Sequence, residues 1–105
     1  MKKTETKTAM EIHKDLCVDI HSMCVKKNHD YGDSAHKIYE EYGLNSYLIR
    51  MSDKMSRIKT LIRTEEQQVK DESIIDSLKD LANYALLATI DVIQYPEMIK
   101  EGKHN

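Results

Sequence analysis

The segment 50–57 places four charged side chains at helical spacing. Arg50, Asp53, Lys54 and Arg57 follow the pattern R-x-x-D-K-x-x-R, so one helical face would carry all four. Arginine and lysine bind phosphate oxygens, and the planar guanidinium of arginine does so with two parallel hydrogen bonds. Asp53 and Arg57 are also spaced for an intrahelical ion pair, which contributes little on an exposed surface. The segment therefore indicates either a phosphate-binding face or an ordinary solvated one.

A second segment carries acidic and amide side chains on one helical face. Asp76, Asp80 and Asn83 are separated by four and three residues. Carboxylates with this spacing can share Mg²⁺, which takes oxygen ligands from one or two carboxylates, from phosphates and from water. A solvated face opposite an apolar arc would show the same pattern. Tyr84 and Leu87 lie on the acidic side, however, which indicates that another segment or subunit covers this face.

The stretch NHDYGD, residues 28–33, combines turn-forming residues around Gly32. Its histidine and aspartates, together with Tyr31, could bind a base or a ribose by stacking and hydrogen bonding. An ordinary turn explains the same residues. We therefore predict a loop here, with a ligand contact as one of two interpretations.

Helical periodicity supplies the elements that would position these residues. The expected helices are 8–27, 34–42, 45–64 and a fourth that starts at a cap on Asp71 or Ser73 and is closed by Pro96. Thr8 and Glu11 match a capping box, and Asn28 is expected to end the first helix. Gly43 is expected to end the short helix, and Asn45 to cap the next one. The polar run after residue 63 is either a connection or a solvated extension of the fourth helix.

These elements predict an all-α fold, a small bundle of three long helices and one short helix. We expect residues 1–105 to form a single domain, with 1–7 and 97–105 frayed. A chain of 105 residues buries only about two-thirds of its unfolded surface, so the core is thin. Apolar residues along 44–62 and 74–93 could form the centre of the core or an interface between subunits. We therefore expect a homo-oligomer.

Composition limits the classes of function. Sixteen basic and eighteen acidic residues give a net charge of -2, which does not attract duplex nucleic acid. The N-terminus lacks the apolar run of a signal peptide, and no stretch reaches the roughly 20 apolar residues that a membrane span needs. Cys17 and Cys24 would lie roughly 10 Å apart on one helix, too far for a disulfide. These features predict free thiols and a cytoplasmic protein that binds neither duplex nucleic acid nor membrane.

The order of three motifs resembles a known family. The segments KNHDYGDS, LIRMSDKMSRI and ESIIDSLKDLANYALL are similar to the phage-borne type-one nucleotide-modification-associated domain family, over roughly residues 26 to 92. The resemblance implies a small α-helical protein linked to nucleotide biology. It implies ligand-binding roles for residues of all three motifs. These are Tyr31, Gly32, Arg50, Asp53, Lys54, Arg57, Asp76, Asp80, Asn83 and Tyr84.

A more distant similarity is to MazG-like all-α nucleotide pyrophosphatases, in which E-x-x-E and E-x-x-D helices complete a Mg²⁺ site on oligomerisation. This sequence departs from that pattern, because its carboxylates are fewer and arginines surround Asp53. Arginine suits gripping phosphates better than it suits activating water through several metal ions.

Three hypotheses follow from these patterns. The first is a protein that binds and sequesters a small nucleotide or nucleotide-derived signal, for example to counter a host defence. The second is a Mg²⁺-dependent nucleoside triphosphate pyrophosphohydrolase with its metal on Asp53, Asp76 and Asp80. The third is a non-catalytic structural interaction module. On the first, the two polar faces would meet in a pocket between subunits.

Overall fold

The computed structural model describes residues 6–31, 34–63 and 67–100, and in this part of the chain the fold is all-α. The helices are α1 (Ala9–Tyr31), α2 (Ser34–Tyr42), α3 (Asn45–Ile62), α4 (Gln67–Gln94) and the 3₁₀ turn η1 (Pro96–Met98). Three long helices and one short helix are as predicted. The described residues contain no strand.

Helix α1 begins where the sequence predicts and ends later. The Thr8 backbone N–H donates to Glu11 Oε1 over 2.8 Å, and the Glu11 N–H donates to Thr8 Oγ1 over 3.1 Å, which confirms the capping box. The prediction that Asn28 ends the helix is wrong, since α1 continues to Tyr31. Asparagine costs a helix well under about 1 kcal/mol relative to alanine, so a single one does not stop it.

The junction between α2 and α3 depends on a glycine. Gly43 has a positive φ of 74°, and its N–H donates to the Tyr39 carbonyl, which confirms it as the residue that ends α2. The predicted cap on Asn45 is wrong, because Asn45 is already helical and Leu44 occupies the cap position without a side-chain bond. The Leu44 N–H instead donates over 2.7 Å to the carbonyl of Ile99. The start of α3 is therefore fixed by the C-terminal segment.

Helix α4 is longer than predicted at its N-terminal end. It begins at Gln67, ahead of the expected caps on Asp71 or Ser73, so the polar run is in part a helical extension. It ends at Gln94, and Pro96 opens η1 as a residue that cannot continue an α-helix. Within the segment 97–105, predicted to be frayed, Glu97 and Met98 belong to η1 and the Ile99 carbonyl accepts the bond from Leu44. Residues 1–5 and 101–105 lie outside the described residues.

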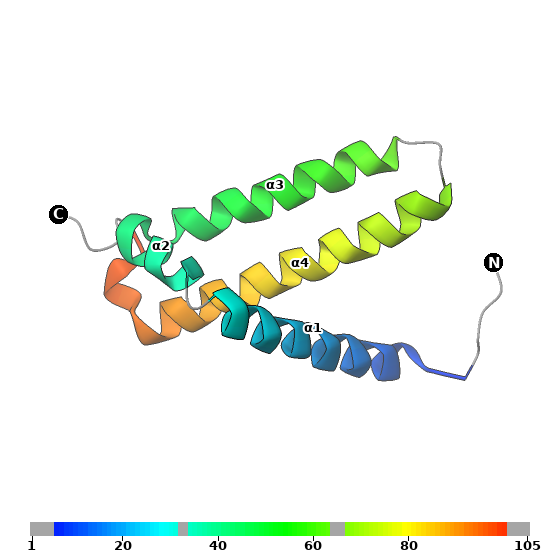
Figure 1. Ribbon diagram of the computed structural model, residues 1–105, viewed down its shortest axis with the longest axis horizontal. Helices are drawn as coiled ribbons and strands as arrows, with labels where there is room; N and C mark the ends of the chain where they lie inside the picture. Colours follow the sequence, from blue (N-terminus) through cyan, green and yellow to red (C-terminus); the bar gives the residue numbers. More distant parts are fainter. Residues whose placement is uncertain (1–5, 32–33, 64–66, 101–105) are drawn as a thin grey trace.

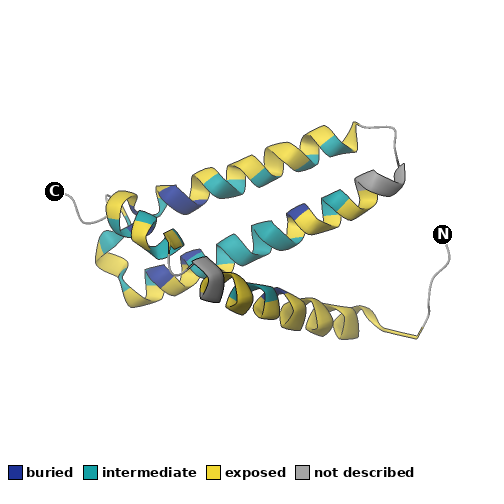
Figure 2. Cartoon of the chain, viewed as in Figure 1, coloured by how far each residue is buried: buried dark blue, intermediate teal, exposed yellow. Residues whose placement is uncertain are grey.

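Helices α3 and α4 form an antiparallel hairpin, with α1 on the other side of α4 and with α2 and η1 across one end (Figure 1). The buried core lies at that end of the hairpin (Figure 2). It consists of Tyr39, Tyr47 and Ala88, with Leu44, Tyr95 and Met98 among the side chains packed around them. The core therefore holds together the part of the hairpin to which the short elements attach.

Little of the remaining surface is buried. Within the described residues, the buried apolar side chains are Ile20, Tyr39, Tyr47 and Ala88. The radius of gyration is 16.3 Å, against about 13 Å for a compact domain of roughly 100 residues. The thin core expected from the chain length is confirmed. None of the described helices combines the length and the apolar content that crossing a bilayer requires.

Candidate functional site

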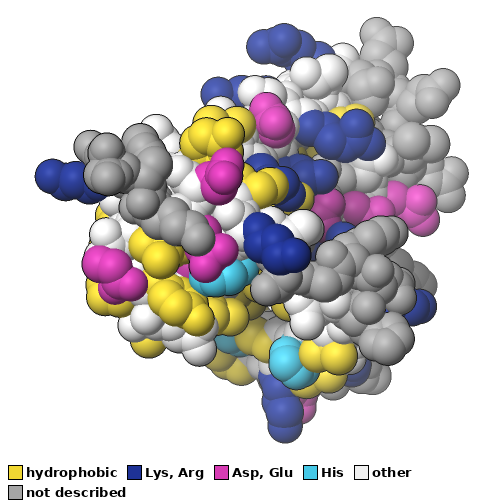
Figure 3. Space-filling view, turned by 60° about the vertical axis from the view of Figure 1, so that its left-hand side comes forward, with side chains coloured by type: hydrophobic (Ala, Val, Ile, Leu, Met, Phe, Trp, Pro, Cys, Tyr) yellow, Lys and Arg dark blue, Asp and Glu magenta, His cyan; other side chains and the backbone are white. Residues whose placement is uncertain are grey.

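A cavity of about 500 Å³ lies where the C-terminal part of α1, helix α2 and the α3–α4 hairpin meet. Its volume is within the range of small-molecule pockets. In Figure 3, histidine and acidic side chains lie beside apolar surface on this end of the molecule, next to a group of lysines and arginines. We call this cavity the pocket.

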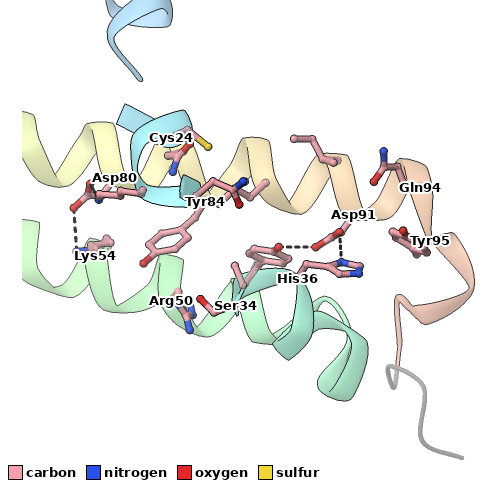
Figure 4. Close-up of a pocket in the computed structure, with 17 residues that line it drawn as sticks. Cys24, Ser34, His36, Arg50, Lys54, Asp80, Tyr84, Asp91, Gln94 and Tyr95 are labelled. Atoms are coloured by element: carbon pink, nitrogen blue, oxygen red, sulfur yellow. Dashed lines mark hydrogen bonds and ion pairs between the residues drawn. The ribbon is translucent and has the colours of Figure 1, made fainter. Parts of the chain in front are cut away.

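One end of the pocket is cationic. Lys54 of α3 lies 3.1 Å from Asp80 Oδ2 of α4, and Lys27 of α1 lies 4.0 Å from Asp80 Oδ1. Arg50 lies one turn before Lys54, with its guanidinium 5.7 Å from the centre of the Tyr84 ring. Tyr84 points from α4 across toward α3 (Figure 4). Three positive side chains and one carboxylate therefore line this end of the pocket.

Arg50 has no carboxylate within ion-pair distance in the part of the chain that the structure describes, although it lines the pocket. Its charge is held by a cation–π contact with Tyr84, which leaves guanidinium N–H groups for a ligand. Such a group is suited to bind a phosphate.

The other end of the pocket contains a buried polar triad that joins three helices. Asp91 of α4, only 4% exposed, accepts a hydrogen bond from the Tyr47 hydroxyl of α3 over 2.5 Å. Its second oxygen lies 2.7 Å from Nδ1 of His36 on α2. Burial and the bond to Asp91 raise the pKa of Tyr47 well above its usual range, so the hydroxyl remains a donor.

Tyrosine side chains surround the triad. The Tyr95 ring lies 4.8 Å from the imidazole of His36, and the Tyr39 hydroxyl donates to the Tyr95 carbonyl over 2.9 Å. Burial raises the pKa of Tyr39 as well, with Asp91 adding to the effect. Aromatic faces and a fixed carboxylate are the groups with which proteins hold a base or a sugar.

The structure brings together half of the site residues predicted from the sequence. Arg50 and Lys54 from α3 line the pocket with Asp80, Asn83 and Tyr84 from α4. We expected these two faces to meet between subunits, but they already meet within one chain. The described pocket is therefore lined by residues of a single chain.

The other predicted residues are placed less directly. Asp53 and Arg57 are exposed and border a second, more open depression beside Arg50 and Lys54. No ion pair joins Asp53 to Arg57, although their spacing allows one. Asp76 is exposed and lines neither cavity.

The structure describes only the first part of the predicted loop, residues 28–31. Tyr31 is the last residue of α1, which replaces the predicted loop by helix up to that point. Gly32 lies outside the described residues. The ligand role of both stays a prediction.

The aspartates proposed as metal ligands do not form one cluster within a chain. Over residues 6–31, 34–63 and 67–100, no three histidine, cysteine or acidic side chains come close enough to hold one ion. Asp80 faces the pocket alone among Asp53, Asp76 and Asp80, so a Mg²⁺ ion there would depend on ligand phosphates for its other oxygens. The cysteines are free, as predicted, and Cys24 borders the pocket.

Sequence reasoning missed the triad of His36, Tyr47 and Asp91. A signal for Asp91 was present, because this acidic residue stands between Ile90 and Val92 in an apolar stretch. A charge in such a run is rarely buried unless it has partners. Nothing in the sequence alone indicated that His36 and Tyr47 are those partners.

Comparison with known proteins agrees with the motifs. No curated protein and no solved structure matches the chain significantly. The family described as nucleotide modification associated domain 1 matches residues 27–92, which include all of α3, most of α4 and all the pocket residues on them up to Asp91. This match covers more than half of the sequence. The chain therefore belongs to the nucleotide modification associated domain 1 family.

Proposed function

We propose that the pocket binds a small phosphorylated nucleotide and that the protein sequesters it. The observation that carries this proposal is the Arg50 guanidinium, which lines the pocket without a carboxylate partner in the described chain. Arg50, Lys54 and Lys27 would hold phosphate oxygens at one end. The family description, which names nucleotides, supports the same ligand class.

The pocket also offers contacts for the rest of a nucleotide. Tyr84 and Tyr95 present aromatic rings, and Asn83 and Gln94 present amides that both donate and accept hydrogen bonds. These amides lie on the same face of α4 as Asp80 and Asp91. A base and sugar would occupy this stretch, with the phosphates toward Lys54.

Sequestration is favoured over hydrolysis by the kind of charge in the pocket. The two carboxylates that line it already have partners, since Asp80 pairs with lysines and Asp91 is held by Tyr47 and His36. A hydrolase with several magnesium ions would need more carboxylate ligands. We propose that the captured ligand is released unchanged, as expected for a protein that depletes a nucleotide signal of a host defence. We also propose that the protein acts as a homo-oligomer.

The test is ligand recovery from a defined mixture. The purified protein is incubated with nucleoside mono-, di- and triphosphates and with cyclic nucleotides, then washed and denatured, and the released small molecules are identified by mass spectrometry. We expect one intact nucleotide in stoichiometric amount. Mg²⁺-dependent product formation over many turnovers would instead support the pyrophosphohydrolase, and no retained nucleotide would contradict the proposal.

Matched variants locate the binding. Lys54→Ala and Arg50→Ala should each weaken binding of the recovered nucleotide by about tenfold or more, as expected for a lost charge-assisted contact. Arg50→Lys should restore only part of the affinity, because lysine lacks the planar fork. Lys59→Ala is the control, since Lys59 is an exposed lysine of α3 outside the pocket. Equal effects of Lys54→Ala and Lys59→Ala would contradict a pocket-bound phosphate.

A further inference from the structure

The side of the α3–α4 hairpin that faces away from the pocket is apolar. On α3, Leu48, Met55 and Ile62 recur every seven residues, which places them on one face of the helix. Each of them is at least 49% exposed. On the helical wheel of α3 they lie roughly 80° to 160° from Arg50 and Lys54, and none of them lines the pocket.

Helix α4 shows the same arrangement. Ile75, Leu78, Leu86 and Ile93 recur at steps of three, eight and seven residues, and each is between 49% and 73% exposed. Asp80 and Tyr84 of the pocket lie roughly 140° to 180° around the helix from Ile75 and Ile93. Because both helices turn their polar faces to the pocket, their apolar faces share the other side. We call these seven α3 and α4 side chains the back face.

The back face is large enough for a stable interface. Seven large side chains, each about half exposed or more, present on the order of 700–800 Å² of apolar surface, close to the roughly 800 Å² that one partner buries in a standard interface. Ala82, Ala85 and Thr89 lie between them on the same α4 stripe, and two lysines border the back face: Lys59 of α3 and Lys79 of α4, which pairs with Asp19 of α1. A soluble protein rarely leaves such a patch uncovered.

We propose that the back face binds a second copy of this chain, so that two hairpins form a four-helix bundle with the two pockets on its outer sides. The occupant is a second copy because the surface is largely apolar, runs along two antiparallel helices and presents about the area that one partner of a stable dimer buries. The chain also has a thin core of its own, and a four-helix bundle supplies the missing burial. Each pocket is built within one chain, so the dimer carries two complete and separate sites.

Sedimentation and light scattering at several protein concentrations, without added nucleotide, test this proposal. We expect a dimer for the native chain. Met55→Glu and Leu78→Glu each place a carboxylate in the centre of the interface and should give a monomer of unchanged helix content. Ile49→Glu is the matched control, because Ile49 is also an exposed apolar residue of α3 but lies roughly 100° to 140° around the helix from the back face. This variant should remain a dimer.

A second variant keeps the test decisive if a glutamate variant unfolds. Leu86→Ala removes contact area without adding charge, and because the interface contains two copies of the residue, the dimer dissociation constant should rise about tenfold or more. A native chain that stays monomeric would overturn the proposal and would leave this face to a different partner. A dimer that survives the back-face variants but is broken by Ile49→Glu would also overturn it. None of these outcomes depends on whether the pocket binds a nucleotide.

Discussion

Asp91 offers the sharpest test of the pocket, because it is a buried carboxylate with two partners from different helices. Replacing it by alanine leaves the Tyr47 hydroxyl and the His36 imidazole without their acceptor. A buried donor left unsatisfied costs about 1–3 kcal/mol. Tyr47 is 2% exposed and should show the full cost, whereas His36 is partly exposed and can reach water. We expect Asp91→Ala to lower the free energy of unfolding by about 3 kcal/mol.

Urea unfolding followed by circular dichroism measures this loss, at one protein concentration so that any dimer contributes equally to every variant. Asp19→Ala is the control, because Asp19 likewise has a partner on another helix, Lys79, but is exposed. An exposed pair contributes about 0–1 kcal/mol. The two aspartates differ in burial and in the kind of partner, so the comparison sets a buried hydrogen-bonded carboxylate against an exposed ion pair.

A double-mutant cycle separates the bond from general disruption of the fold. Tyr47→Phe and Asp91→Ala should be less damaging together than the sum of their separate effects, with a coupling of about 1.5–3 kcal/mol for a hydrogen bond to a charged group. Additive effects would show that the Tyr47–Asp91 bond contributes nothing to stability. A loss for Asp91→Ala no larger than that for Asp19→Ala would refute the argument from burial.

Two further predictions concern stability. Gly43→Ala should lower the free energy of unfolding by about 1–2 kcal/mol from its positive φ alone. The loss should be larger still, because the new Cβ would lie 2.6 Å from the Ile99 carbonyl oxygen. The control is Ser52→Ala, at an exposed α3 position, which should change the free energy of unfolding by less than about 0.5 kcal/mol. A Gly43→Ala loss as small as the Ser52→Ala change would contradict this view of the junction. The folded state raises the pKa of Tyr47 and Tyr39 above the 10.0 of an exposed tyrosine, so the contribution of these two groups to stability should be constant below about pH 10 and be lost as the pH rises above it. Urea midpoints measured across this range should fall less for Tyr47→Phe than for the native chain, and equal slopes would contradict the assignment.

Local signals predicted the helices well where a specific residue enforces the boundary. The side chains of the capping box at Thr8 bond backbone N–H groups at the start of α1, and Gly43 adopts a positive φ at the end of α2. Both effects act directly on the backbone at the helix boundary. Asn28 and Asn45 are weaker signals, because asparagine is tolerated inside a helix and a cap can be replaced by tertiary contacts. The Leu44 bond to Ile99 is such a contact, and it joins residues too far apart for any local pattern to reveal.

The residues of the pocket could be predicted better than its location. A helical wheel compares each residue only with its own helix, so it showed correctly that Arg50 and Lys54 lie apart from the α3 apolar stripe. It could not show how α3 is rotated against α4. The helical wheels therefore predict that a second subunit covers the polar faces, whereas the hairpin turns these faces toward each other within one chain. Asp91 could have been predicted as a pocket residue from the sequence, since it continues the stripe of Asp80 and Tyr84 at helical spacing.

The pocket and the back face lie on the same two helices, α3 and α4. The side of the hairpin that could have formed the core lines a polar cavity instead. Ala88, Tyr39 and Tyr47 therefore make up most of the buried apolar interior of the described residues. If a second copy covers the back face, it stabilises α3 and α4 in the arrangement that brings Lys54 to Asp80. Dimerisation and nucleotide binding should then strengthen each other by the same factor, because coupling between two binding equilibria is reciprocal. A nucleotide that binds Met55→Glu as tightly as the native chain would show that the hairpin holds its pocket without the partner.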